Sequence, residues 1–107
     1  NFCFTVKNVP KNQFLATRQV SSKMGPNGDV VVVKGKYVWE TYQQVYQEVS
    51  DFARGIAVMG FPKGCGVGIY AKNRKEYVVA ELASYALGGY NTAIYDTFGP
   101  EAAGYVI

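Results

Sequence analysis

Histidine is absent from the 107 residues, and cysteine occurs only at positions 3 and 65. Without histidine the chain lacks the commonest general base and any Ser–His or Cys–His nucleophile pair, which disfavours a self-contained hydrolase. Two cysteines without histidine cannot supply a four-ligand zinc site. A disulfide between Cys3 and Cys65 stays open, although so low a count suits a reducing compartment.

Long apolar runs and strong charge are also missing. No run approaches the roughly 18–20 apolar residues of a membrane-spanning helix, and no signal peptide is visible. Only 18% of the residues are charged, with eleven Lys/Arg against eight Asp/Glu, and the basic ones cluster only at Lys72, Arg74 and Lys75. This predicts no nucleic-acid binding but mildly favours an anionic ligand or lipid headgroup. The hydrophobic content of 49% is that of a globular protein.

The first forty residues are typical of strands and turns. Phe14 to Val20 predicts a short strand, and residues 24–29, which are rich in turn formers, predict a loop. Val30 to Val33 is a β-branched run. The Lys34-Gly-Lys36 stretch is then expected to turn the chain into Tyr37-Val-Trp39, giving a hairpin with a short loop. Residues 1–40 are therefore predicted to form a β-rich extension.

The period changes at Thr41, where an amphipathic helix is expected to begin. Thr41 and Gln44 fit a capping box, while Gly60 suits the position after the last helical residue and Pro62 prevents continuation. The apolar positions follow helical spacing: Tyr42, Val45, Tyr46, Val49, Phe52, Ala53 and Ile56. We expect the aromatic members, Tyr42, Tyr46 and Phe52, to lie in the core.

Two more helices and two strands follow. Gly66–Tyr70 and Thr92–Tyr95 are short apolar runs expected to be buried strands. Asn73 is a cap candidate for a helix running to Leu87, and Pro100 begins another. Strands joined by helical crossovers lie parallel, so residues 41–107 predict an α/β unit with the order helix, strand, helix, strand, helix. Two strands are too few for a stable open sheet, which indicates part of a larger domain.

Several other residues carry alternatives. The glycines at 64, 66 and 68 precede a strand rather than open a helix, so a tight turn is favoured over a phosphate loop. Arg18 is a candidate for pairing with a carboxylate, and residues 74–76 are expected to be solvated. Trp39 is expected to pack between the hairpin and the long helix, the alternative being exposure toward a partner surface.

The two strand ends are the candidate ligand site, because open α/β sheets bind ligands beyond the carboxyl ends of their strands. These ends are Tyr70-Ala-Lys-Asn73 and Tyr95-Asp-Thr-Phe98. Asp96 and Thr97 lie between a strand end and a helix start, where free amides could meet an anion. The alternative is that they only cap the following helix.

Several spaced motifs, from about Pro10 to the end of the chain, resemble long-chain acyl-CoA synthetases of the adenylate-forming, AMP-binding superfamily. Tyr37-Val-Trp-Glu-Thr-Tyr42 is similar to the tyrosine, tryptophan, threonine, tyrosine signature that opens the family's adenylate-forming region. Gly66–Tyr70 followed by Asn73-Arg74 resembles the family's strand and turn. Ile94-Tyr-Asp-Thr-Phe-Gly99 is similar to its leucine-tyrosine-aspartate-threonine-leucine-glycine motif. The upstream segment Phe14–Arg18 also matches.

The resemblance implies a two-step ligase that joins a long-chain fatty acid to coenzyme A at the expense of ATP, with Mg²⁺ stabilising the charge. The family's phosphate loop, tyrosine-glycine-threonine-glutamate motif, ribose-binding aspartate and C-terminal lysine do not occur here. The chain is thus expected to be a partial N-terminal domain, inactive alone and binding none of these ligands tightly. It supplies no catalytic residue and no metal ligand.

One binding role follows from the same resemblance. In the acetyl-CoA branch of the superfamily, the segment after the corresponding strand approaches the nucleotide of coenzyme A. It aligns with residues 95–98, so Tyr95, Thr97 or backbone amides are the candidate contacts. An aspartate at position 96 would repel a phosphate.

The resemblance also implies partners and a place in the cell. The remainder of the synthetase chain is the expected neighbour, with self-association of the fragment through its uncovered edges. The full-length parent is expected to be intracellular and cytosol-facing, with peripheral attachment to the endoplasmic reticulum or another organelle surface. The competing readings are a stand-alone nucleotide-binding module and a protein-interaction module.

Overall fold

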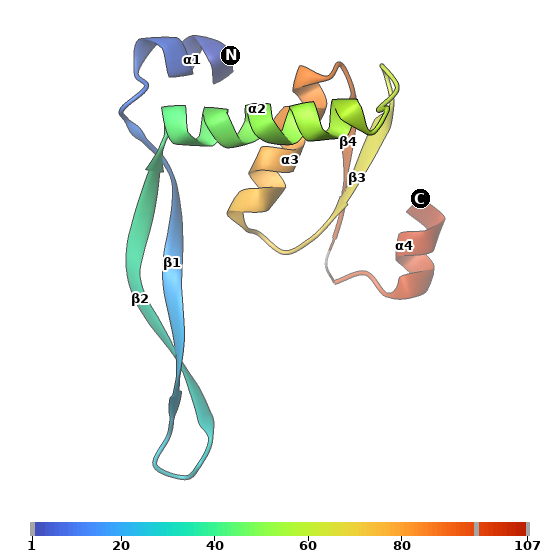
Figure 1. The fold of residues 1–107 in the computed structure, drawn as a ribbon. Coiled ribbons are helices and arrows are strands. Elements are labelled where there is room, and N and C mark those ends of the chain that lie inside the picture. Colours follow the sequence, from blue (N-terminus) through green and yellow to red (C-terminus); the bar gives the residue numbers. More distant parts are fainter. Residues whose placement is uncertain (1, 96, 107) are drawn as a thin grey trace.

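The computed structural model describes residues 2–95 and 97–106, which form a long hairpin beside a helix-and-strand unit (Figure 1). The elements in chain order are α1 (Phe2–Asn8), β1 (Gln13–Met24), β2 (Val30–Thr41), α2 (Tyr42–Val58), β3 (Gly66–Tyr70), α3 (Lys75–Ala86), β4 (Tyr90–Ile94) and α4 (Pro100–Val106). The predicted order from Thr41 and the α/β class are confirmed.

The hairpin is longer and more continuous than predicted. β1 and β2 pair antiparallel, and the turn lies between Met24 and Val30, where Gly28 has a φ of 78°. The predicted turn at Lys34-Gly-Lys36 is wrong, because β2 runs unbroken through it. Gly35 and Lys36 instead lie opposite the single residue Gln19, between the pairs Arg18–Tyr37 and Val20–Lys34. The extra residue is a β-bulge, which glycine accommodates easily.

Helix α1 was not expected from the sequence, which predicted strands and turns over the first forty residues. The seven residues of α1 include two Phe, a Thr and a Val, none of them strong helix formers. Tertiary packing accounts for the helix: the ring of Phe2 lies 5.6 Å from that of Phe14 and 6.4 Å from that of Tyr42. Contacts between distant segments therefore override local propensity here.

Helix α2 begins and ends as predicted. The Thr41 hydroxyl accepts from the Gln44 amide at 3.2 Å, and the Gln44 side chain accepts from the Thr41 amide at 2.8 Å, which completes the capping box. Met59 is the C-cap, and Gly60 follows it with a φ of 89°. A left-handed residue just after the cap is the usual helix end.

The core lies between α2 and α3 and is built from small residues. Val45, Val49 and Ala53 of α2 pack with Val79 and Ala83 of α3. The expectation that Tyr42, Tyr46 and Phe52 form the core is wrong, since Tyr46 is 40% and Phe52 45% exposed. Small side chains at four-residue spacing let the helices approach, which moves the larger rings to the rim. Tyr42 is half-buried there and stacks on Phe14 at 4.4 Å.

The two short strands pair in parallel, as predicted. Tyr70 lies opposite Ile94, and Gly66 lies opposite Tyr90. The expectation that both strands are buried is wrong within this chain, because only Ile69 and Ile94 are buried. Helix α3 contacts both strands. On the opposite face Gly66, Gly68, Tyr70, Tyr90 and Thr92 are exposed, whereas Ile94, which pairs with Tyr70 on that face, is buried.

The molecule is extended because the hairpin projects away from the helices (Figure 1). Its radius of gyration is 17.4 Å, whereas a compact chain of this length has about 13 Å. Trp39 lies on β2 and is 49% exposed, so the expected burial between hairpin and helix is wrong. Within the part of the chain that the structure describes, no helix is long and apolar enough to cross a bilayer.

Candidate functional site

Both predicted strand ends lie at one edge of the sheet. Because β3 and β4 are parallel and Tyr70 pairs with Ile94, the segments 71–73 and 95–98 leave the sheet side by side. The structure therefore brings together the two segments that the sequence singled out. We call this region the carboxyl edge.

A hydrogen bond joins the two segments of the carboxyl edge. The Tyr70 hydroxyl donates to the Phe98 carbonyl at 2.7 Å. The Phe98 amide donates to the Tyr95 carbonyl at 3.0 Å, and the rings of Tyr95 and Phe98 meet edge to face at 5.3 Å. The loop after β4 is thus held against the end of β3.

The two candidate nucleotide contacts are accessible on this loop. Tyr95 is 66% exposed and Thr97 is exposed. Asp96, the third residue considered, lies outside the described residues. An exposed ring and a hydroxyl are groups that can stack on a base and bond a phosphate. Whether Tyr95 and Thr97 contact a nucleotide stays a prediction.

A cleft of about 850 Å³ separates the segment after β3 from the hairpin. One wall is the hairpin, residues 15–18 and Tyr37, and the other runs from Lys72 to Glu76 and includes Val78. Among residues 2–95 and 97–106, Arg18 does not have the carboxylate partner that was expected. Its Nε donates to the Gly35 carbonyl at 3.0 Å, and its guanidinium lies 5.5 Å from the centre of the Tyr37 ring.

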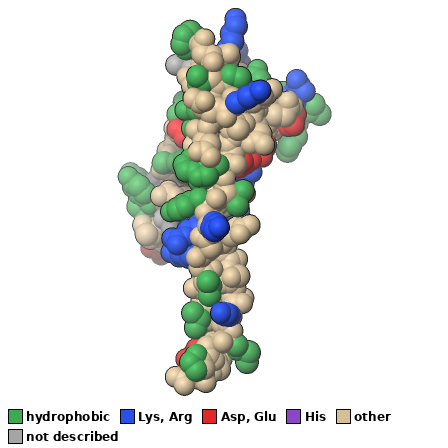
Figure 2. Space-filling model, turned by 90° about the vertical axis from the view of Figure 1, so that its left-hand side faces the viewer, with side chains coloured by type: hydrophobic (Ala, Val, Ile, Leu, Met, Phe, Trp, Pro, Cys, Tyr) green, Lys and Arg blue, Asp and Glu red, His purple; other side chains and the backbone are tan. Residues whose placement is uncertain are grey.

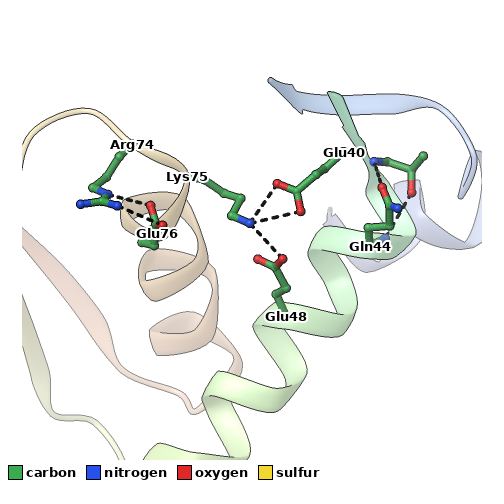
Figure 3. Close-up of polar contacts among 7 residues, drawn as sticks. Glu40, Gln44, Glu48, Arg74, Lys75 and Glu76 are labelled. Carbon is green, nitrogen blue, oxygen red and sulfur yellow. Dashed lines mark hydrogen bonds and ion pairs between the residues drawn. The ribbon is translucent and has the colours of Figure 1, made fainter. Parts of the chain in front are cut away.

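Lys75 is the most heavily bonded cation of the described residues (Figure 3). Its Nζ lies 3.0 Å from Glu40 Oε2 and 3.0 Å from Glu48 Oε1, and its side chain is 23% exposed. Hydrogen bonds to Glu48 and then Glu40 raise the pKa of Lys75. The expectation that Lys75 is solvated is wrong. It joins the end of β2, helix α2 and helix α3.

Arg74 and Glu76 form a second, exposed pair. The Arg74 Nε lies 2.7 Å from Glu76 Oε2, and this bond raises the pKa of Arg74 and lowers that of Glu76. Both side chains are more than 60% exposed, so the expected solvation holds for these two. Arg74 rather than Asn73 is the N-cap of α3, and it makes no side-chain capping bond. The predicted Asn73 cap is therefore wrong.

Chemistry-bearing groups are sparse in the described residues. Within residues 2–95 and 97–106, no three His, Cys, Asp or Glu side chains are grouped to hold a metal ion. The glycines at 64–68 form the predicted turn into β3, with a φ of 80° at Gly64. No disulfide joins Cys3 to Cys65.

Comparison with known proteins decides the family. The sequence pattern described as "AMP-binding enzyme" matches residues 19–107. The chain belongs to this family. The curated relatives it matches include long chain acyl-CoA synthetases 4 and 5 of Arabidopsis thaliana, 32% and 34% identical over 99% of this chain. A probable CoA ligase of Humulus lupulus is 35% identical over 96% of it.

These relatives are much longer than the 107 residues. The chain spans 15% of the length of the two Arabidopsis proteins and 14% of the Humulus protein. The predicted resemblance to long-chain acyl-CoA synthetases is confirmed, since the likeness extends over nearly the whole chain.

Solved structures show the same fold. The adenylation domain of a carboxylate reductase from Mycobacterium chelonae matches 98% of this chain with a TM-score of 0.80 at 13% identity. A two-domain piece of a carboxylic acid reductase from Segniliparus rugosus, in complex with AMP, matches 98% with a TM-score of 0.81 at 14% identity. The chain covers 16% and 15% of them, respectively. The fold is thus that of an adenylation domain.

Proposed function

We propose that this chain is the partial N-terminal domain of a long-chain fatty acid–CoA ligase, with residues 1–40 as its extension and 41–107 as its α/β unit. The observation that carries the proposal is the 32–34% identity to Arabidopsis long chain acyl-CoA synthetases across 99% of the chain. In such a ligase the fatty-acid carboxylate attacks the α-phosphate of ATP and releases pyrophosphate. The thiol of coenzyme A then attacks the acyl-adenylate, forming the thioester and releasing AMP.

The described residues do not fit the groups that this chemistry needs. Among these described residues no group of three or more His, Cys, Asp or Glu side chains is available for Mg²⁺, and the glycine-rich turn enters a strand instead of cradling phosphates. The role of the 107 residues in the ligase is thus structural, and the carboxyl edge is in addition a ligand-binding region. Alone it is expected to leave the transition-state charge unstabilised.

Exchange of radiolabelled pyrophosphate into ATP tests this division. With Mg²⁺ and a long-chain fatty acid, the protein at its natural length should exchange label, and should form acyl-CoA when coenzyme A is added. The 107-residue chain should stay at background. Robust turnover by the short chain would contradict its inactivity, and a natural-length protein that makes no acyl-CoA would contradict the ligase.

The carboxyl edge is proposed to contact the nucleotide of coenzyme A through Tyr95 and Thr97. In the natural-length protein, Tyr95→Ala and Thr97→Ala should raise KM for coenzyme A several-fold and leave KM for ATP unchanged. Tyr105→Ala is the matched control, since Tyr105 is 92% exposed and lies in α4. If the variants changed both KM values equally, or changed neither, Tyr95 and Thr97 would not be contacts for coenzyme A.

The natural-length protein is further proposed to be intracellular and to work at a membrane surface exposed to the cytosol. Its proposed substrate supports this, because a long acyl chain gains about 0.8 kcal/mol per buried CH₂ on entering a bilayer. The fatty acid is therefore concentrated at that surface.

A further inference from the structure

The projecting part of the hairpin, residues 18–37, has an excess of positive charge as large as that of the whole chain. Between Arg18 and Tyr37 there are four Lys/Arg residues and one Asp, whereas the rest of the chain has seven basic and seven acidic residues. Residues 18–37 thus carry a net charge of +3, and Glu40 near the base of β2 reduces that of the whole hairpin, which projects from the core (Figure 1), to +2. A projecting cationic element favours an anionic partner.

One face of the hairpin is also apolar and exposed. Directly opposed residues of an antiparallel pair share a face. The even-numbered residues of β1 therefore share a face with their partners on β2, in the pairs Met24–Val30, Ser22–Val32, Val20–Lys34, Arg18–Tyr37 and Ala16–Trp39. We call this the even face. Its aliphatic members are 59–81% exposed: Val20, Met24, Val30 and Val32.

The opposite face differs. It pairs Lys23 with Val31 and Ser21 with Val33, and these two valines are only 47% and 39% exposed. In Figure 2 the narrow hairpin shows separate hydrophobic side chains with Lys and Arg between them. Beyond the cleft at the base of the hairpin, its apolar side chains and cations form neither a groove nor a continuous basic stripe, which disfavours a nucleic-acid or peptide site there.

The type of side chain on the even face changes from the tip of the hairpin to its base. The aliphatic residues lie at the tip, the cations Lys34 and Arg18 come next, and the rings of Tyr37 and Trp39 lie toward the base. A bilayer offers acyl chains beneath anionic headgroups, which matches exposed aliphatic side chains at the tip followed by cations. We propose that the even face docks on an anionic lipid surface, with Met24 and Val30 entering the headgroup layer.

This inference depends on the membrane-surface part of the proposed function and not on acyl transfer. Co-sedimentation of the natural-length protein with vesicles tests it, using phosphatidylcholine alone and phosphatidylcholine mixed with phosphatidylserine. Binding should be stronger to the mixed vesicles and should weaken as salt is raised, since exposed charges are screened. A protein that binds neither vesicle would overturn both the membrane-surface proposal and this one, while acyl-CoA formation would remain as evidence for the ligase.

Charge-matched variants locate the contact. The triple variant Lys23→Gln, Lys34→Gln, Lys36→Gln should weaken binding to the mixed vesicles by on the order of tenfold or more. The control Lys7→Gln, Lys11→Gln, Lys63→Gln removes the same charge from exposed positions outside the hairpin. It should bind the vesicles as tightly as the unsubstituted protein does. If both variants weakened binding equally, or neither did, the hairpin would not be the membrane contact, although membrane association itself would stand.

Ser21 and Ser22 allow a test of the face itself, because they are adjacent and point to opposite sides. An environment-sensitive fluorescent amino acid replacing Ser22 should shift to the blue on mixed vesicles, and the same label replacing Ser21 should shift much less. Equal shifts would overturn the choice of face. A label at 22 that is already shielded without vesicles would overturn the proposal, since the face would then be covered by protein.

Discussion

Lys75 joins three elements that are distant in the sequence. Its ammonium lies between Glu40, at the end of β2, and Glu48, one turn into α2, while its backbone begins α3. The partners are 35 and 27 residues away, so no local pattern could have predicted them. Sequence reasoning placed Lys75 among solvated charges for that reason. Two carboxylates on one partly buried ammonium make it a structural contact.

Replacing Lys75 should destabilise the fold and change how its stability depends on pH. Lys75→Met leaves Glu40 and Glu48 facing each other and should cost about 1–2 kcal/mol near neutral pH. Because the pKa of Lys75 is raised above 10.5, its contribution is fully present below that pH and is lost as the pH rises through the folded value. The difference in urea-unfolding free energy should therefore shrink as the pH is raised into the strongly alkaline range.

Lys72→Met is the control for this series. Lys72 is exposed on the same loop, so its replacement should change stability by less than about 0.5 kcal/mol. A Lys75→Met variant as stable as the Lys72→Met variant would show that the network does not support the fold.

The α2 helix shows what local sequence can predict. Its capping box, its Gly60 end and its length follow from residues within one turn of each terminus, and each was predicted. The loop at residues 24–29 was predicted, but the hairpin turn was assigned to Lys34-Gly-Lys36, and the bulge at Gly35 and helix α1 were missed. These features depend on cross-strand register and on rings brought together from distant segments. At the carboxyl edge, the sequence indicated both segments but could not foresee the Tyr70–Phe98 hydrogen bond.

The N-terminal cap of α2 should contribute measurably to stability. Thr41→Ala removes the hydroxyl that accepts from the Gln44 amide and should cost about 1 kcal/mol. Thr41→Ser keeps an acceptor and should recover most of it. Thermal unfolding of the two variants distinguishes the cap from the loss of a β-branched residue at the end of β2, since both variants lose the methyl group.

The C-terminal end of α2 offers a paired test of glycine. Neither Gly55, inside the helix, nor Gly60, after it, has an atom within 4 Å of an added Cβ. Only backbone conformation separates them. Gly60→Ala should destabilise by about 1 kcal/mol, because its φ of 89° is strained for an L side chain. Gly55→Ala should stabilise by about 0.5–1 kcal/mol. Changes of the same sign would contradict this explanation.

The whole molecule has more accessible surface than a compact protein of the same mass. The accessible surface is 8142 Å², whereas a compact protein of 11.8 kDa has about 5900 Å². Parallel sheets are normally covered on both faces. Here α3 contacts both strands, yet on the other face Gly66, Gly68, Tyr70, Tyr90 and Thr92 are exposed and only Ile94, beside Tyr70, is buried. The fold of the 107 residues is thus that of a unit with a free sheet face.

That free face should make the isolated chain self-associate. Two exposed strand edges and an uncovered face with Tyr70 and Tyr90 favour edge pairing and apolar contact between copies. Light scattering across concentration should show a rising average mass. Thr92→Lys places a charge on the face and should lower it, whereas Gln43→Lys adds the same charge on the exposed side of α2 and should not. A monodisperse chain with high thermal stability would show instead that the 107 residues need no neighbour to cover the sheet, because α2, α3 and the hairpin would then suffice to hold it.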